Sequence, residues 1–169
     1  MCLGVRREEV WALKWSDFDF VTGTVTIART IIESRVYERT KTEASAAELP
    51  LDDDLVQLLL DWRGKSEFNR DTDWVWASPY SGGKMPLHFQ SMQKETIVPA
   101  SVAAGLGKIG WHCFRHTYRS WLNAAGTPLG VQKGLLRHSN ISTTANVYGA
   151  GVADVMREFN SRVVKRVIQ

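Results

Sequence analysis

Six side chains spread along the sequence carry most of the chemistry that it offers. They are Arg6, Lys41, His112, Arg115, His138 and Tyr148. The first five supply positive charge and hydrogen-bond donors without a carboxylate. Such a set suits a phosphodiester, because it can hold the anionic group and stabilise the charge that builds on its oxygens. The tyrosine hydroxyl is the one group of the set that could attack phosphorus.

Five of these six residues also have an ordinary structural interpretation when each is taken alone. His112 and Arg115 lie three apart, so they would share one polar face of a helix, as solvated residues often do. Lys41 could discourage pairing at a strand edge, and His138 could cap a helix end. Tyr148 could be half-buried packing. Their joint occurrence in this order favours the phosphodiester interpretation.

Composition describes an ordinary globular chain. Its 169 residues are 44% hydrophobic and 23% charged, which predicts a single domain over residues 1–169. The net charge of +3 is compatible with nucleic acid but does not demand it. Cys2 and Cys113 form neither a disulfide framework nor a metal-ligand spacing. With no apolar run of membrane-spanning length and no signal peptide, we expect a cytoplasmic protein.

The helices and strands that must position these side chains can be predicted from the sequence. Together they indicate a mainly α protein with a small antiparallel β-sheet, an α+β fold. Apolar spacing predicts a helix over 6–15, and β-branched alternation predicts a strand over 24–27. Strands over 34–40 and 47–51 would place Lys41 in the connection between them. Further helices are predicted after the Asp52-Asp53-Asp54 cap and over 88–104, where Pro99 should kink or interrupt the helix.

A series of separate helices is predicted for the C-terminal half. An amphipathic helix over 111–125 would bury a stripe formed by Phe114, Tyr118, Trp121, Leu122 and Ala125. Thr127 is the expected N-cap of the next helix, with Pro128 at its first position. A short helix starting at 139–140 would carry Tyr148 near its end. The tail over 152–167 is predicted to form a further amphipathic helix. This helix would either pack on its own domain or dock on a neighbouring subunit.

The motifs around these residues make the chain similar to a known family. The quoted motifs are Gly4-Val5-Arg6-Arg7-Glu8-Glu9 with Leu13-Lys14-Trp15-Ser16-Asp17, Lys41-Thr42-Glu43-Ala44-Ser45 with Leu49-Pro50-Leu51, His112-Cys113-Phe114-Arg115-His116-Thr117, and residues 135–148. They resemble the sequence motifs in the catalytic domain of the tyrosine recombinases, the phage integrase family. Glu8 and Ala46 depart from the family pattern, but neither removes a chemical group. The resemblance implies that the chain lacks the N-terminal core-binding domain and the first helix.

The resemblance implies a site-specific recombinase or integrase of a mobile element. Tyr148 would attack the scissile phosphate, leaving a 3′-phosphotyrosyl link and a free 5′-hydroxyl. Arg6 and Arg115 would clamp the non-bridging oxygens, because each carries a permanently charged planar fork. His112 and His138 would add hydrogen bonds, and His112 is a candidate acceptor of the tyrosine proton. Lys41 would protonate the leaving oxygen, and neither a metal nor another cofactor is expected.

The implied partner is double-stranded DNA, with no membrane. The resemblance also implies self-association on DNA, a tetrameric synapse in the full-length family, with the helix over 152–167 as a candidate contact. Two other functions remain open. One is a truncated DNA-binding remnant of an integrase that does not recombine. The other is an enzyme like the type IB topoisomerases, which share this chemistry.

Overall fold

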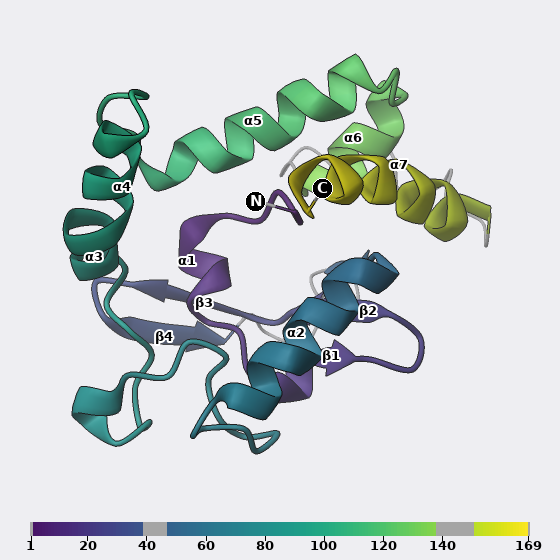
Figure 1. Ribbon diagram of the computed structural model, residues 1–169. Helices are drawn as coiled ribbons and strands as arrows, with labels where there is room; N and C mark the ends of the chain where they lie inside the picture. The colour runs from purple at the N-terminus through teal and green to yellow at the C-terminus, as the bar shows by residue number, and fades with distance from the viewer. Residues whose placement is uncertain (1, 39–46, 138–150, 169) are drawn as a thin grey trace.

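A computed structural model describes residues 2–38, 47–137 and 151–168. Over these residues the chain is mainly helical with two small antiparallel sheets, which confirms the predicted α+β class (Figure 1). The elements are α1 (Arg7–Val10), the 3-10 helix η1 (Trp15–Asp17), β1 (Phe18–Asp19), β2 (Thr24–Ile27), β3 (Arg29–Ile32), β4 (Arg35–Glu38), β5 (Ala47–Pro50), α2 (Asp53–Lys65), η2 (Pro79–Ser81), α3 (Phe89–Met92), the π-helix η3 (Gln93–Ile97), α4 (Val98–Ala103), α5 (Trp111–Ala124), α6 (Leu129–Leu136) and α7 (Gly151–Ile168). Figure 1 shows α5 running from α3 and α4 at one end to α6 and α7 at the other.

The larger sheet has the order β1-β2-β5, and α2 packs on it. Val25 pairs with Leu49 in antiparallel register, and these two residues and Ile27 are almost fully buried. Val25 and Ile27 lie two apart, so both point to the same face. The Asp52 side chain caps α2 by accepting a hydrogen bond from the Asp54 amide at 3.0 Å. The predicted strands over 24–27 and 47–51 and the predicted cap are therefore confirmed.

A second sheet consists of the hairpin β3–β4. Its turn residues, Glu33 and Ser34, have φ angles of +48° and +64°. Positive φ at both central residues is the geometry of tight hairpin turns, whose usual sequence signal is Asn-Gly or Asp-Gly. Because that signal is missing, β3 was not predicted, and the strand predicted over 34–40 begins one residue late, at β4. The two strands that flank Lys41 in the sequence pair with different partners, β4 with β3 and β5 with β2.

The first predicted helix, over 6–15, is wrong in extent, because α1 covers only Arg7–Val10. Beyond α1 the backbone pairs with a distant segment. The Leu13 carbonyl accepts from the amide of Val75 at 3.0 Å, and the Trp15 amide donates to the carbonyl of Asp73 at 3.1 Å. These strand-like contacts use backbone groups that a longer helix would have needed for itself.

The helical segment over 89–103 contains the interruption predicted at Pro99. Helix α3 passes into the π-helix η3, and α4 begins at Val98 with proline in its first turn. A proline has no N–H, and its ring excludes the carbonyl four residues earlier. The wider turns of the π-helix η3 lie directly before α4, the helix whose first turn contains Pro99.

Helix α5 confirms the predicted amphipathic helix. Tyr118 and Leu122 are fully buried against α6 and α7, while the other members of the predicted stripe are half-buried. The predicted cap of the next helix is wrong. Helix α6 has Pro128 as its N-cap residue, and the buried Thr127 hydroxyl has no hydrogen-bond partner within the described parts of the chain. The Thr127 carbonyl instead accepts from the Gln132 side chain at 2.8 Å.

The tail forms α7, as predicted, and packs on its own chain. Val163 belongs to the core formed with α5 and α6, and Met156 contacts this core as well as the core of the larger sheet. Asn160 of α7 is 1% exposed; it accepts from the Tyr118 hydroxyl at 2.8 Å and donates to the Pro50 carbonyl at 3.1 Å. Helix α7 therefore ties the helical half to the larger sheet.

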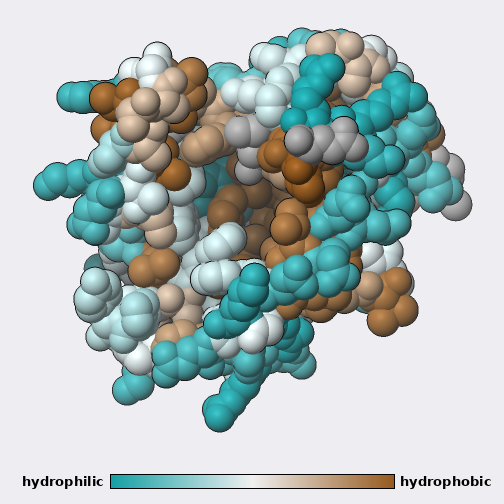
Figure 2. All heavy atoms as spheres, in the orientation of Figure 1, coloured by the Kyte–Doolittle hydropathy of each residue, from teal (hydrophilic) through white to brown (hydrophobic). Residues whose placement is uncertain are grey.

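An apolar hollow opens between the N-terminal segment and α2, and Figure 2 shows hydrophobic side chains gathered around a hollow on this face. It has a volume of about 270 Å³ and includes Leu3, Leu13 and Leu59 in its lining. Trp62 borders it and is 42% exposed. In the described parts of the chain, no helix combines the length and the apolar character needed to cross a bilayer.

Candidate active site

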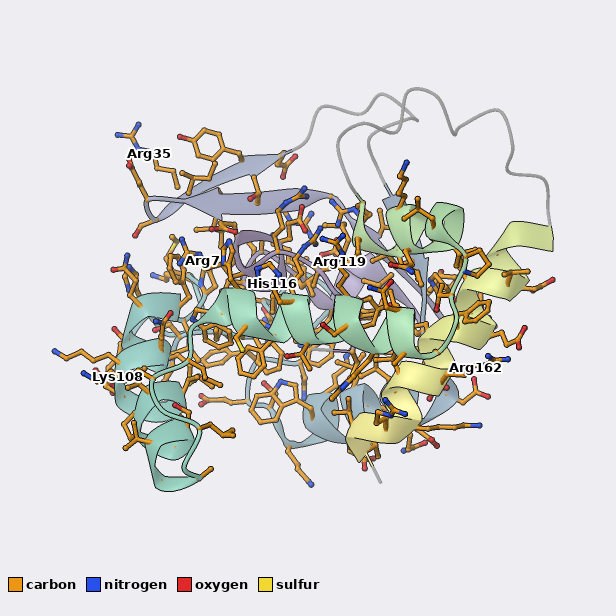
Figure 3. The ribbon with its side chains drawn as sticks, turned by 90° about the horizontal axis from the view of Figure 1, so that it is seen from above. Arg7, Arg35, Lys108, His116, Arg119 and Arg162 are labelled. Carbon is orange, nitrogen blue, oxygen red and sulfur yellow. The ribbon has the colours of Figure 1, made fainter. Side chains whose placement is uncertain are left out.

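A cleft of about 150 Å³ opens where the N-terminal segment, α5 and the end of α6 meet. Its lining comprises Val5, Arg6, Arg7, Trp111, His112, Arg115, His116, Arg119 and Leu136. Six of these nine are arginines or histidines, and no acidic residue is among them. Figure 3 shows Arg7, His116 and Arg119 gathered along one side of α5. A concave, cationic lining of this kind attracts a polyanion.

Among the predicted site residues that the structure describes, Arg115 is the most firmly held. Its guanidinium donates to the Gly4 carbonyl and to the Leu136 carbonyl at the end of α6. Burial lowers the pKa of Arg115, and the neighbouring charge of Arg6 lowers it further. A guanidinium nevertheless remains charged at neutral pH. Two backbone acceptors therefore fix the plane of a permanent cation beside the cleft.

Gly4 makes the first of these contacts possible. Its φ angle is +57°, and a Cβ at this position would overlap the ring of the buried Tyr118. Glycine adopts this left-handed backbone without a steric penalty. The N-terminal segment can therefore pass directly over α5 and present the Gly4 carbonyl to Arg115.

Arg6 reaches the same cleft from the N-cap position of α1. Its backbone amide donates to a carboxylate oxygen of Glu9 at 2.9 Å, and its guanidinium pairs with the other oxygen at 3.2 Å. The guanidinium also donates to the Arg137 carbonyl at 3.4 Å. The side chain of Arg6 is 38% exposed, so part of its charge remains open to the cleft.

His112 lies one turn before Arg115 on α5, is exposed and lines the cleft. The structure thus brings Arg6, His112 and Arg115 together, as their interpretation as a phosphodiester site requires. Lys41, His138 and Tyr148 lie outside the described residues. Leu136, which lines the cleft, stands two positions before His138 in the sequence.

Glu9 and Arg137 were not predicted to belong to the site. Their side chains are 1% and 4% exposed, and they form an ion pair with an N–O distance of 2.9 Å behind Arg6. Glu9 had a local signal, since it lies three residues after Arg6 and so faces the same side of a helix start. Arg137 had none, because it lies 128 residues away from Glu9 in the sequence.

Comparison with known proteins decides the family. The model of the phage integrase family matches residues 2–152. The chain belongs to the phage integrase family. The family resemblance of the sequence motifs is thereby confirmed, and the cleft lies at the junction of the segments that carry the first arginine motif and the His-x-x-Arg motif.

This phage integrase family member is similar to several tyrosine recombinases. The tyrosine recombinase XerC-like protein of Caldanaerobacter subterraneus subsp. tengcongensis is 29% identical over 167 residues, which cover 86% of this chain and 42% of the relative. The chain therefore spans less than half the length of that curated relative.

Two solved structures share the fold. The Tn1549 transposon integrase in complex with circular intermediate DNA superposes with a TM-score of 0.67 at 18% identity, over 98% of this chain and 56% of the integrase chain. The integrase from mycobacterium phage Brujita gives a TM-score of 0.65 at 23% identity, over 95% and 47% of the two chains.

Proposed function

We propose that this integrase family member is a site-specific recombinase that cleaves and rejoins DNA strands through a 3′-phosphotyrosyl intermediate. The observation that carries the proposal is the convergence of Arg6, His112 and Arg115 on one cationic cleft. Arg6 is separated from the other two by more than a hundred positions in the sequence, so their meeting is a property of the fold.

The two arginines suit the charge problem of phosphodiester cleavage. A phosphodiester is anionic, and further negative charge develops on its non-bridging oxygens as a nucleophile approaches. Arg6 and Arg115 are close enough for the charge of Arg6 to lower the pKa of Arg115, after the larger effect of burial. An anion between them would relieve this repulsion, and it would be held more tightly as its charge grows.

The remaining steps fall to residues assigned through the family resemblance. The Tyr148 oxygen forms a bond to phosphorus while the bond from phosphorus to the 5′-oxygen breaks. His112 accepts the tyrosine proton, Lys41 delivers a proton to the departing 5′-oxygen, and His138 donates a hydrogen bond to the phosphate. Attack by another 5′-hydroxyl on the phosphotyrosine reverses the step and joins the strands without ATP.

Double-stranded DNA is the proposed partner. The cationic lining of the cleft supports it, and so does the fold shared with an integrase whose structure contains DNA. Self-association on DNA is proposed as well, with α7 as the candidate contact. In this structure α7 packs on its own chain, so docking on a neighbour would require its apolar contacts to be exchanged.

A selection on suicide duplexes tests the function even though the target site is undefined. Nicked duplexes with a randomised central sequence are incubated with the chain, and adducts that survive denaturation are isolated and their DNA sequenced. Recovery of a shared sequence joined to the protein supports the recombinase. DNA binding without any adduct would favour the non-recombining remnant, and relaxation of supercoiled plasmid without strand exchange would favour a topoisomerase-like activity.

A further inference from the structure

Arg137 is a buried arginine at the C-cap position of α6, directly after the cleft residue Leu136. We propose that Arg137 is a positioning residue for the phosphate clamp, and that its ion pair with Glu9 holds Arg6 and Arg115 in their orientations. The inference rests on the proposed function, because it concerns the two arginines that would bind the phosphate.

Two consecutive carbonyls at the end of α6 accept hydrogen bonds from the two clamp arginines. The Leu136 carbonyl accepts from Arg115, and the Arg137 carbonyl accepts from Arg6 at 3.4 Å. The last carbonyls of a helix lack partners within the helix and carry its negative dipole end, so they are suitable acceptors for cations. The orientation of the backbone at 136–137 therefore sets where both guanidinium groups lie.

The backbone at Arg137 adopts a conformation that is rare for residues other than glycine. Arg137 has φ +50° and ψ +53°, which is the left-handed region. Its side chain is anchored at the far end, because both terminal nitrogens contact the Glu9 carboxylate, at 2.9 and 3.3 Å. Planar, paired contacts of this kind fix direction as well as distance. The side chain thus holds the turn that presents the two carbonyls.

The ion pair also preserves positive charge for a ligand. Glu9 contacts both Arg6 and Arg137, so these three side chains together carry a net charge of +1. If Arg6 alone paired with Glu9, the two would be neutral. Arg137 therefore lets Glu9 orient Arg6 without cancelling the charge that faces the cleft.

Three substitutions separate the side chain from the backbone. Arg137→Gly and Arg137→Ala both remove the guanidinium, but only glycine adopts the left-handed backbone freely. Arg137→Lys keeps the charge and loses the paired contacts. Arg63→Ala is the matched control, since Arg63 pairs with Asp71 at 2.6 Å outside the cleft. Circular dichroism verifies that each variant is folded.

Two measurements are made on each variant. The first is the rate of adduct formation at saturating suicide duplex. The second is the affinity of the cleft for inorganic phosphate, followed by the guanidinium NMR signals of Arg6 and Arg115. We expect Arg137→Gly and Arg137→Ala to lose about 10²-fold in rate, because misplaced groups no longer meet the phosphate in a productive geometry. Phosphate affinity should fall by about tenfold or more, and Arg63→Ala should match wild type in both.

The outcomes separate this inference from the proposed function. A folded Arg137→Gly variant that binds phosphate and cleaves like wild type would overturn the inference while the function stands, since only the backbone shape would then matter. A wild-type chain that forms no adduct, but loses phosphate affinity on Arg137→Gly substitution, would refute the function and support the inference. If neither variant folds, Arg137→Lys decides: a loss of about tenfold in phosphate affinity supports the inference, and unchanged affinity overturns it.

Discussion

The Tyr118 hydroxyl offers a quantitative test of how the cleft is held together. Tyr118 lies on α5, three residues after Arg115, and donates to Asn160 of α7 at 2.8 Å, with the tyrosine 0% exposed. Tyr118→Phe removes the hydroxyl and keeps the ring, so the packing beneath Gly4 is unchanged. The Asn160 oxygen then stays buried without its donor.

Leaving a buried acceptor unsatisfied costs about 1–3 kcal/mol. For a domain of this size each kcal/mol corresponds to about 2–4 °C in Tm, so Tm should fall by about 2–12 °C. Thermal unfolding followed by circular dichroism measures the shift. Tyr80→Phe is the control: this tyrosine is 97% exposed, and its loss should leave Tm unchanged.

The same residue predicts a dependence on pH. Burial raises the pKa of Tyr118 above its ordinary value of 10.0. The unfolded chain therefore releases this proton first, so the stability that this group contributes is present below about pH 10 and declines as the pH rises above it. The free energy of unfolding should fall less steeply above about pH 10 in Tyr118→Phe than in wild type. A Tm within about 1 °C of wild type, together with the same slope at high pH, would refute the assigned hydrogen bond and its burial.

Further predictions concern the proposed chemistry. Arg6→Ala and Arg115→Ala should each lower the single-turnover cleavage rate by about 10²–10³, while Arg63→Ala should not; equal rates for all three would remove the clamp from the mechanism. Lys41→Ala should regain activity on a 5′-bridging phosphorothiolate, whose sulfur leaves without a proton, and an equal defect on both substrates would rule out a general-acid role. Binding to duplex DNA should weaken steeply with salt, with log affinity falling by about 0.9 per phosphate contact for each unit of log salt. Salt-independent binding would contradict a phosphate-based interface.

Periodic patterns made much of the fold predictable. Tyr118 and Leu122 lie four apart on a predicted helix and are both fully buried, and Val25 and Ile27 alternate as a strand requires. The placement of His112 and Arg115 on one side of α5 followed from their spacing of three. These features depend on residues close in the sequence, which is why the sequence alone could indicate them.

Features that depend on distant partners could not be predicted in this way. Helix α1 ends early because the segment after it pairs with residues 73–75. The pair of Glu9 with Arg137 spans 128 positions and has no local pattern. In the sequence, Arg137 is one more basic residue beside His138. Its burial and its pairing with Glu9 depend on the packing of α6 against the N-terminal segment.

The proposed strand cleavage is tested most directly by identifying the residue that becomes joined to DNA. Wild type and Tyr148→Phe are compared on a suicide duplex recovered by the selection, and any adduct is digested and its modified peptide located by mass spectrometry. We expect wild type to form a denaturation-resistant adduct on the peptide containing Tyr148, through a 3′-phosphate. Tyr148→Phe should bind the same duplex with unchanged affinity and form none. An adduct in the Tyr148→Phe variant, or one that maps to another residue, would show that Tyr148 is not the nucleophile.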